Sequence, residues 1–82
     1  MSKDLLISKI RTFASRHNIS EGQAWAMFNH TYYEIFKTNL ENLKKRHCHQ
    51  YGIGFMGLPE FIEEMGLLEP AVVVASYMNK SI

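Results

Sequence analysis

The chain has 82 residues, of which 46% are hydrophobic and 21% are charged, and its formal net charge is +1. This hydrophobic fraction excludes an intrinsically disordered tail, and the length allows no more than one domain. The small net charge argues against a dedicated nucleic-acid coat or a polybasic membrane-binding protein. We therefore expect a single domain over residues 1–82, with a core that is marginal for its size.

Residues 3–17 have the pattern of an amphipathic helix. Leu6 and Ile10 begin a row of apolar side chains that recur at helical spacing on one face. Ser2 stands at the position of an N-cap, where its side chain can accept a hydrogen bond from a first-turn amide. Asn18 suits a left-handed residue that ends the helix.

A second helix is predicted over residues 21–46. Ser20 and Gln23 form a capping box, in which each side chain satisfies a backbone amide of the other. At about 1.5 Å per residue, this helix approaches 40 Å in length. Its apolar stripe consists of Ala24, Phe28, Tyr32, Ile35, Phe36, Leu40 and Leu43.

The rest of the chain is too short to cover that stripe, so we expect a homodimer that pairs along helix 21–46. Cys48 is the only cysteine, which excludes a disulfide bond within the chain. The residues expected to form the core and the self-association surface are Trp25, Phe28, Tyr32, Ile35 and Phe36. The residues expected to contact another protein are Tyr33, Phe55 and Met56, although Phe55 and Met56 would be core residues if they lie under the helices, which is the favoured alternative for these two.

The C-terminal part is predicted to hold a loop and two shorter helices. Three glycines mark residues 47–58 as the loop, and a proline opens the helix expected over 59–65. For residues 70–79 a helix is favoured, although three consecutive valines leave a strand open. The expected fold is thus an all-α bundle of three to four helices with one long central helix.

Two sequence motifs suggest a ligand or metal site, but the support for each site is weak. Residues 52–57 match G-x-G-x-x-G, but they follow a predicted helix, whereas a dinucleotide-binding loop follows a strand. His47, Cys48 and His49 are adjacent, and no metal-binding pair of residues at a suitable spacing accompanies them. The serines lack a visible base and the glutamates read as solvated charges. We expect no enzyme activity, cofactor, metal or small-molecule substrate.

The charges are unevenly distributed along the chain. Residues 1–50 hold eight Lys and Arg against four Asp and Glu, whereas residues 51–82 hold one against four. Ordinary solvated helix faces explain this, and pairing of opposite halves of two copies is the alternative. The cations Lys44, Lys45 and Arg46 suit a helix C-terminus. They also keep open a second function, that of a small DNA- or RNA-binding regulator.

The chain shows no targeting signal, because charges interrupt its N-terminal apolar residues. Its longest apolar stretch, residues 71–78, is less than half the roughly 20 residues of a membrane span. We expect a cytoplasmic protein without a membrane span.

The opening Met1-Ser2-Lys3-Asp4-Leu5-Leu6-Ile7, together with the length, resembles the cytoplasmic antiholins of T-even bacteriophages. Arg16-His17-Asn18-Ile19-Ser20 and Ala24-Trp25 are also similar to an opening shared by small prophage helical domains. The first resemblance implies a lysis-inhibition protein in the host cytoplasm that binds the cytoplasmic part of a holin. Such binding delays assembly of the membrane lesion that starts lysis. The family brings no catalytic or metal-binding residues.

Overall fold

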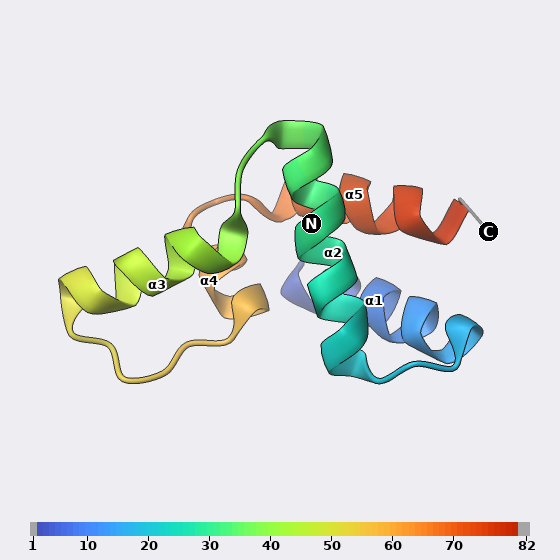
Figure 1. Cartoon of the computed structure of the whole chain (residues 1–82), viewed down its shortest axis with the longest axis horizontal. Helices are drawn as coiled ribbons and strands as arrows, with labels where there is room; N and C mark the ends of the chain where they lie inside the picture. Colours follow the sequence, from blue (N-terminus) through green and yellow to red (C-terminus); the bar gives the residue numbers. More distant parts are fainter. Residues whose placement is uncertain (1, 81–82) are drawn as a thin grey trace.

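The structure is a computed structural model that describes residues 2–80. Within this range the chain forms five helices, which are α1 (Lys3–His17), α2 (Glu21–Phe36), α3 (Leu40–Tyr51), α4 (Leu58–Glu64) and α5 (Leu68–Lys80) (Figure 1). The expectation of an all-α fold is confirmed. The expected three or four helices become five, because residues 21–46 do not form one long helix.

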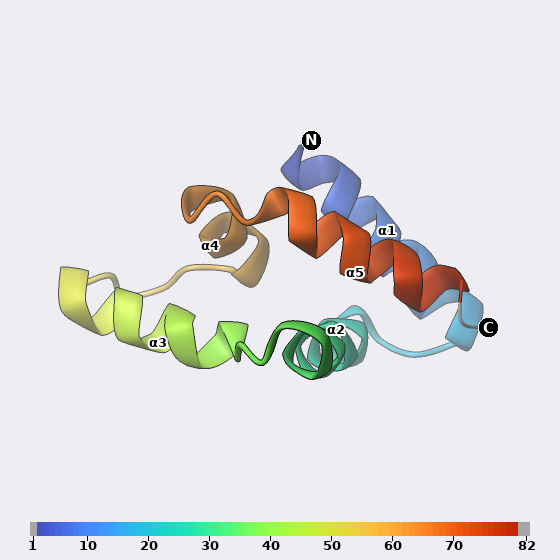
Figure 2. The same ribbon diagram turned by 90° about the horizontal axis from the view of Figure 1, so that it is seen from above.

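Helices α1, α2 and α5 form the larger part of the hydrophobic core, to which α4 and Leu40 of α3 also belong. In Figures 1 and 2, α1 and α5 lie side by side and run in the same direction, and α2 crosses them steeply. Helix α5 has five buried residues, α1 has four and α2 has three. The buried side chains of these three helices are Leu6, Ile10, Phe13, Ala14, Ala24, Phe28, Tyr32, Ala71, Val72, Val74, Ala75 and Met78.

Helices α3 and α4 extend from one end of this core. Figure 2 shows α3 leading away from α2, with the α3–α4 connection at the end of the molecule opposite the last turn of α5. The extents of the molecule, 38 × 23 × 22 Å, reflect this arm. Its buried residues are Leu40 of α3 and Leu58, Phe61 and Ile62 of α4. No helix in the described range is long and apolar enough to cross a membrane.

The helix ends near the N-terminus follow from the local sequence. The Ser2 hydroxyl accepts a hydrogen bond from the Leu5 backbone N–H at 3.2 Å, and Asn18 is left-handed with φ 55°. Ser20 and Gln23 make both hydrogen bonds of the predicted capping box, at 3.1 and 3.0 Å. The N-cap of α1, its terminator and the capping box of α2 are therefore confirmed.

The two C-terminal helices are close to their expected positions. Pro59 lies in the first turn of α4, where the missing amide hydrogen costs no helical hydrogen bond. Gly66 has φ 72°, a conformation that glycine adopts without strain, and it separates α4 from α5. Residues 70–79 lie within α5, so the valine run is helical. Burial of two of its three valines supplies packing that offsets their modest helix propensity.

The long helix expected over residues 21–46 is corrected to two helices. The chain leaves α2 at Lys37, which is left-handed with φ 56°, and Asn39 begins α3 as its N-cap. Leu40 is completely buried as a result. In a straight helix, the following apolar residues would project beyond the core, so the turn allows one chain to cover much of the stripe by itself.

The loop expected over residues 47–58 is also shorter than predicted. Helix α3 continues to Tyr51, and Gly52 ends it in the left-handed region with φ 66°. The connection between α3 and α4 is therefore residues 52–57. Consequently His47, Cys48 and His49 are helical residues, and their side chains point in different directions around α3.

Candidate functional site

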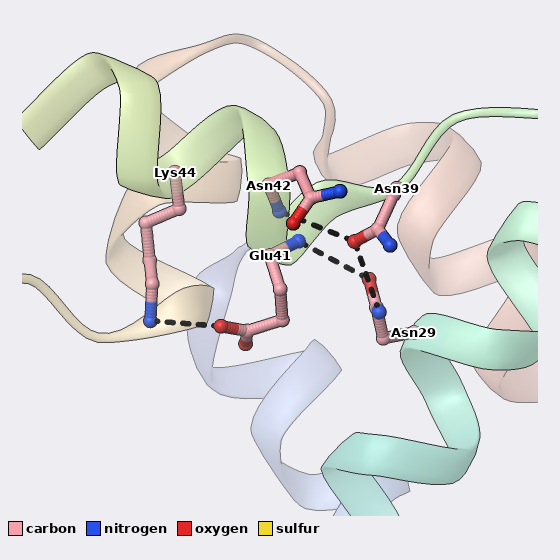
Figure 3. A network of polar contacts seen from close by, with 5 residues as sticks. All are labelled: Asn29, Asn39, Glu41, Asn42 and Lys44. Atoms are coloured by element: carbon pink, nitrogen blue, oxygen red, sulfur yellow. Dashed lines mark hydrogen bonds and ion pairs between the residues drawn. The ribbon is translucent and has the colours of Figure 1, made fainter.

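The start of α3 is fixed by a network of asparagine side chains (Figure 3). The Asn39 side-chain oxygen accepts hydrogen bonds from the Asn42 backbone N–H at 3.2 Å and the Asn29 carboxamide at 3.3 Å. The Asn29 oxygen accepts the Glu41 backbone N–H at 3.3 Å. Two first-turn amides of α3, which have no partner within the helix, are thereby satisfied. Since Asn29 belongs to α2, the network sets the direction in which α3 leaves α2.

His47 is the central side chain where α3 faces α4. Its ring centroid lies 4.9 Å from that of Tyr51 and 5.5 Å from that of Phe61. The side chain is only 16% exposed, and its Nε2 lies 3.7 Å from Oε2 of Glu64. That distance is too long for a hydrogen bond, and Nε2 is buried without another partner in the described part of the chain. The imidazole therefore packs mainly as an aromatic group, with a carboxylate nearby.

Two adjoining hollows lie between α3 and α4, and we call them together the α3–α4 groove. The first has a volume of about 320 Å³, and the second about 590 Å³. They meet at His47, Tyr51 and Met65, which line both. The groove is mostly apolar, and its complete lining is Leu43, Arg46, His47, Gln50, Tyr51, Ile53, Phe61, Glu64, Met65 and Leu67.

The open sides of the groove carry large apolar side chains. Tyr51 is 65% exposed and Met65 is 48% exposed. Phe55, in the connection that leads from α3 to α4, is 89% exposed. Aromatic residues and methionine are enriched where proteins contact one another. The arrangement can therefore bind an apolar side chain of another molecule.

The three expected partner contacts lie in different environments. Phe55 is exposed in the connection between α3 and α4 and lines neither hollow, whereas Met56 is partly buried against the hydrophobic core. Tyr33 is 46% exposed near the end of α2. Figures 1 and 2 show the last turns of α2 well separated from the loop of residues 52–57, so Tyr33 and Phe55 do not form one surface.

The residues expected for core and self-association divide into two groups. Phe28 and Tyr32 are buried, and Trp25 is partly buried with its ring edge-on to Phe28. Burial raises the pKa of the Tyr32 hydroxyl above its ordinary value. Ile35 and Phe36, in contrast, are nearly half exposed at the end of α2. The Phe36 ring packs on Tyr32 with centroids 4.8 Å apart.

Part of the charge imbalance is met within the chain. Glu60 forms an ion pair with Lys3 at 3.5 Å, which joins α4 to α1. Glu64 lies against His47, as described above. Two of the glutamates in the acidic half thus face residues of the basic half in the same molecule. The Lys3–Glu60 pair is partly exposed and contributes little to stability.

Of the three consecutive cations of α3, Lys44 to Arg46, one forms an ion pair within the described chain. Lys44 is bound to Glu41 at 3.4 Å, whereas Lys45 and Arg46 are exposed. Arg46 borders the first hollow of the groove.

The glycine motif of residues 52–57 lies between two helices, so no strand precedes it and the dinucleotide-binding geometry is absent there.

No potential metal site of three or more His, Cys, Asp or Glu side chains occurs among residues 2–80. Cys48 is a half-buried free thiol. His49 is exposed, while His47 faces the groove, so the three adjacent residues do not converge. Of the three, His47 packs between α3 and α4, against Phe61.

The sequence interpretation missed the groove, although a signal for it exists. Leu43, His47 and Tyr51 are spaced four residues apart, which places them on one face of a continuous helix. The predicted helix ended at Arg46, so His47 and Tyr51 were placed in a loop and this spacing was not recognised. Gly52 is the residue that marks the true end, because helices commonly terminate at a glycine.

Comparison of the chain with protein-family models, with curated proteins and with solved structures found no match.

Proposed function

We propose that this protein is a non-catalytic regulator that binds another protein through the α3–α4 groove. The observation that carries this proposal is the exposure of Tyr51 and Met65 on both sides of an apolar hollow. An apolar side chain inserted there would lose water contact on several sides, which is typical of a binding hot spot.

The partner we propose is the cytoplasmic segment of a holin. This choice comes from the resemblance of the sequence to T-even antiholins, and the exposed groove is compatible with it. Binding in the host cytoplasm would hold holin molecules apart and delay the lesion that starts lysis. The mechanism requires only occupation of a surface, so it needs no cofactor or catalytic group.

We further propose that two copies associate through the end of α2. Ile35 and Phe36 are 47% and 44% exposed there, and Tyr33 is 46% exposed on the same turns. Pairing of these side chains would bury apolar surface that one chain leaves open. Light scattering tests this directly, since a monomer at tens of micromolar would contradict the dimer.

The test of the holin proposal is calorimetric titration of the protein with a soluble cytoplasmic holin segment. Met65→Glu places a charge at the meeting point of the two hollows and should abolish binding. Val73→Glu is the matched control, because Val73 is 55% exposed on α5, outside the groove. Circular dichroism checks that both variants are folded. Absence of binding by the wild-type protein, or equal binding by Met65→Glu, would contradict the proposal.

Nucleic acid is the rival partner, through Lys45 and Arg46. Purified protein should show no nucleic-acid absorbance after a low-salt preparation. Absorbance near 260 nm that disappears at high salt would instead favour a DNA- or RNA-binding regulator, because phosphate contacts are strongly salt-dependent.

A further inference from the structure

The two hollows of the α3–α4 groove differ in charge. Among the described residues, Arg46 is the one permanently charged side chain lining the first hollow, and Glu64 is the only acidic one lining the second. Between them lie His47, Tyr51 and Met65, which both hollows share. The groove therefore has a cationic end, an apolar middle and an acidic end.

Arg46, the cation at the first end, is not paired with another group of the described chain. Lys44, two residues earlier, is held by Glu41 at 3.4 Å. Arg46 has no hydrogen bond or ion pair with any residue of the described chain. A guanidinium group presents a planar fork of donors that fits a carboxylate, and arginine is enriched in binding hot spots.

The acid at the other end has a neighbour. Oε2 of Glu64 lies 3.7 Å from the His47 Nε2, and the carboxylate is about half exposed. A second carboxylate placed in that hollow would meet a like charge, which disfavours binding. An acidic ligand group is thus attracted to one end of the groove and repelled from the other.

We propose that the groove binds a peptide segment in which a bulky apolar residue lies close to an aspartate or glutamate. The apolar side chain packs between Tyr51 and Met65, and the carboxylate pairs with Arg46. The charges at the two ends of the groove fix the side of the apolar residue on which the carboxylate lies. This inference rests on the proposed protein-binding function and adds the chemical identity of the bound segment.

The test is selection of binders from a library of random displayed peptides, followed by affinity measurements with synthetic copies of the enriched peptides. We expect enriched peptides to carry an acid close to a large apolar residue. Arg46→Gln should weaken their binding about tenfold or more, the loss expected for one charge-assisted contact. Lys45→Gln is the matched control, because it removes the same charge from an exposed position that does not line the groove.

A charge reversal makes the test specific to the contact. Arg46→Glu should reject the acidic peptides and accept copies in which lysine replaces the acid. Circular dichroism of each variant separates a lost contact from a lost fold. This reversal is not expected if Arg46 acts only by supporting the helix.

Each contrary outcome has a defined meaning. The enriched peptides can lack an acid, bind the wild-type and Arg46→Gln proteins equally and fail to bind Met65→Glu. That result overturns the pairing of a peptide carboxylate with Arg46 and leaves the groove as a binding site. Peptides unaffected by Met65→Glu bind elsewhere and overturn the proposed peptide specificity of the groove. A library that yields no binder overturns the charge inference, while the holin titration decides the proposed function separately.

Discussion

Helices α3 and α5 have nearly the same length, 12 and 13 residues, but they are packed very differently. Helix α5 contributes five buried residues to the core, whereas α3 contributes Leu40 alone. The polar ends of α3 are satisfied by specific caps, and most of its surface faces solvent or the groove. The comparison indicates that α5 stabilises the fold together with the other helices of the core, whereas α3 contributes little to that core. The side of the α3–α4 arm that lines the groove is therefore available for the proposed binding surface.

The strongest test of this division compares an aromatic residue from each region. Phe28→Ala removes a completely buried ring from the core and should lower the free energy of unfolding by about 3–5 kcal/mol. Tyr51→Ala removes a ring that is 65% exposed on the arm and should change it by about 0.5 kcal/mol or less. Urea denaturation measures both. Similar losses in the two variants would contradict the division.

A smaller effect is expected at the junction of the two regions. Asn39→Ala removes the N-cap of α3 and leaves the Asn42 amide without a partner, which should cost about 1 kcal/mol. Hydrogen exchange should accelerate at the amide of Asn42 while the amides of α5 keep their protection. Asn42→Ala is the control, because its backbone, and not its side chain, takes part in the described network. Equal effects of the two substitutions would show that the cap does not position α3.

The smallest expected effect concerns Tyr32 in the core. An unfolded tyrosine ionises near pH 10, while burial raises the pKa of this hydroxyl in the folded protein. Above about pH 10 the folded state therefore holds more protons than the unfolded state, and the free energy of unfolding falls as pH rises. Tyr32→Phe should show a shallower decline between about pH 9 and about pH 11 in urea denaturation. An unchanged decline would mean that Tyr32 does not contribute to it.

Sequence reasoning located the features that depend on neighbouring residues. Ser2, Ser20 with Gln23, and Asn18 act within one or two helical turns, so their roles can be inferred from spacing alone. The break before Asn39 could not be found in this way. Its cap is supported by Asn29 ten residues earlier, and the break is favoured by burial of Leu40 in a core formed by distant helices. The apolar spacing also continues across the break, which concealed it.

The proposed binding surface was predictable only in part. Phe55 was predicted to contact a partner if its side chain were exposed, and the side chain is 89% exposed. The groove itself combines α3 with α4, and its α3 side requires the helix to continue through His47 to Tyr51. Three consecutive cations, Lys44 to Arg46, are typical of a helix C-terminus. The local sequence therefore favours a helix end at Arg46. Packing of His47 against Phe61 is a tertiary contact that this local pattern does not reveal.

Backbone NMR of the protein titrated with the soluble holin segment tests the central claim most directly. The division into a stabilising core and a binding arm predicts that chemical shifts change in the second half of α3, in residues 52–57 and in α4. Residues of α1 and α5 should keep their shifts. Changes concentrated on α1 and α5, with the arm unaffected, would contradict the assignment of the α3–α4 groove as the binding surface.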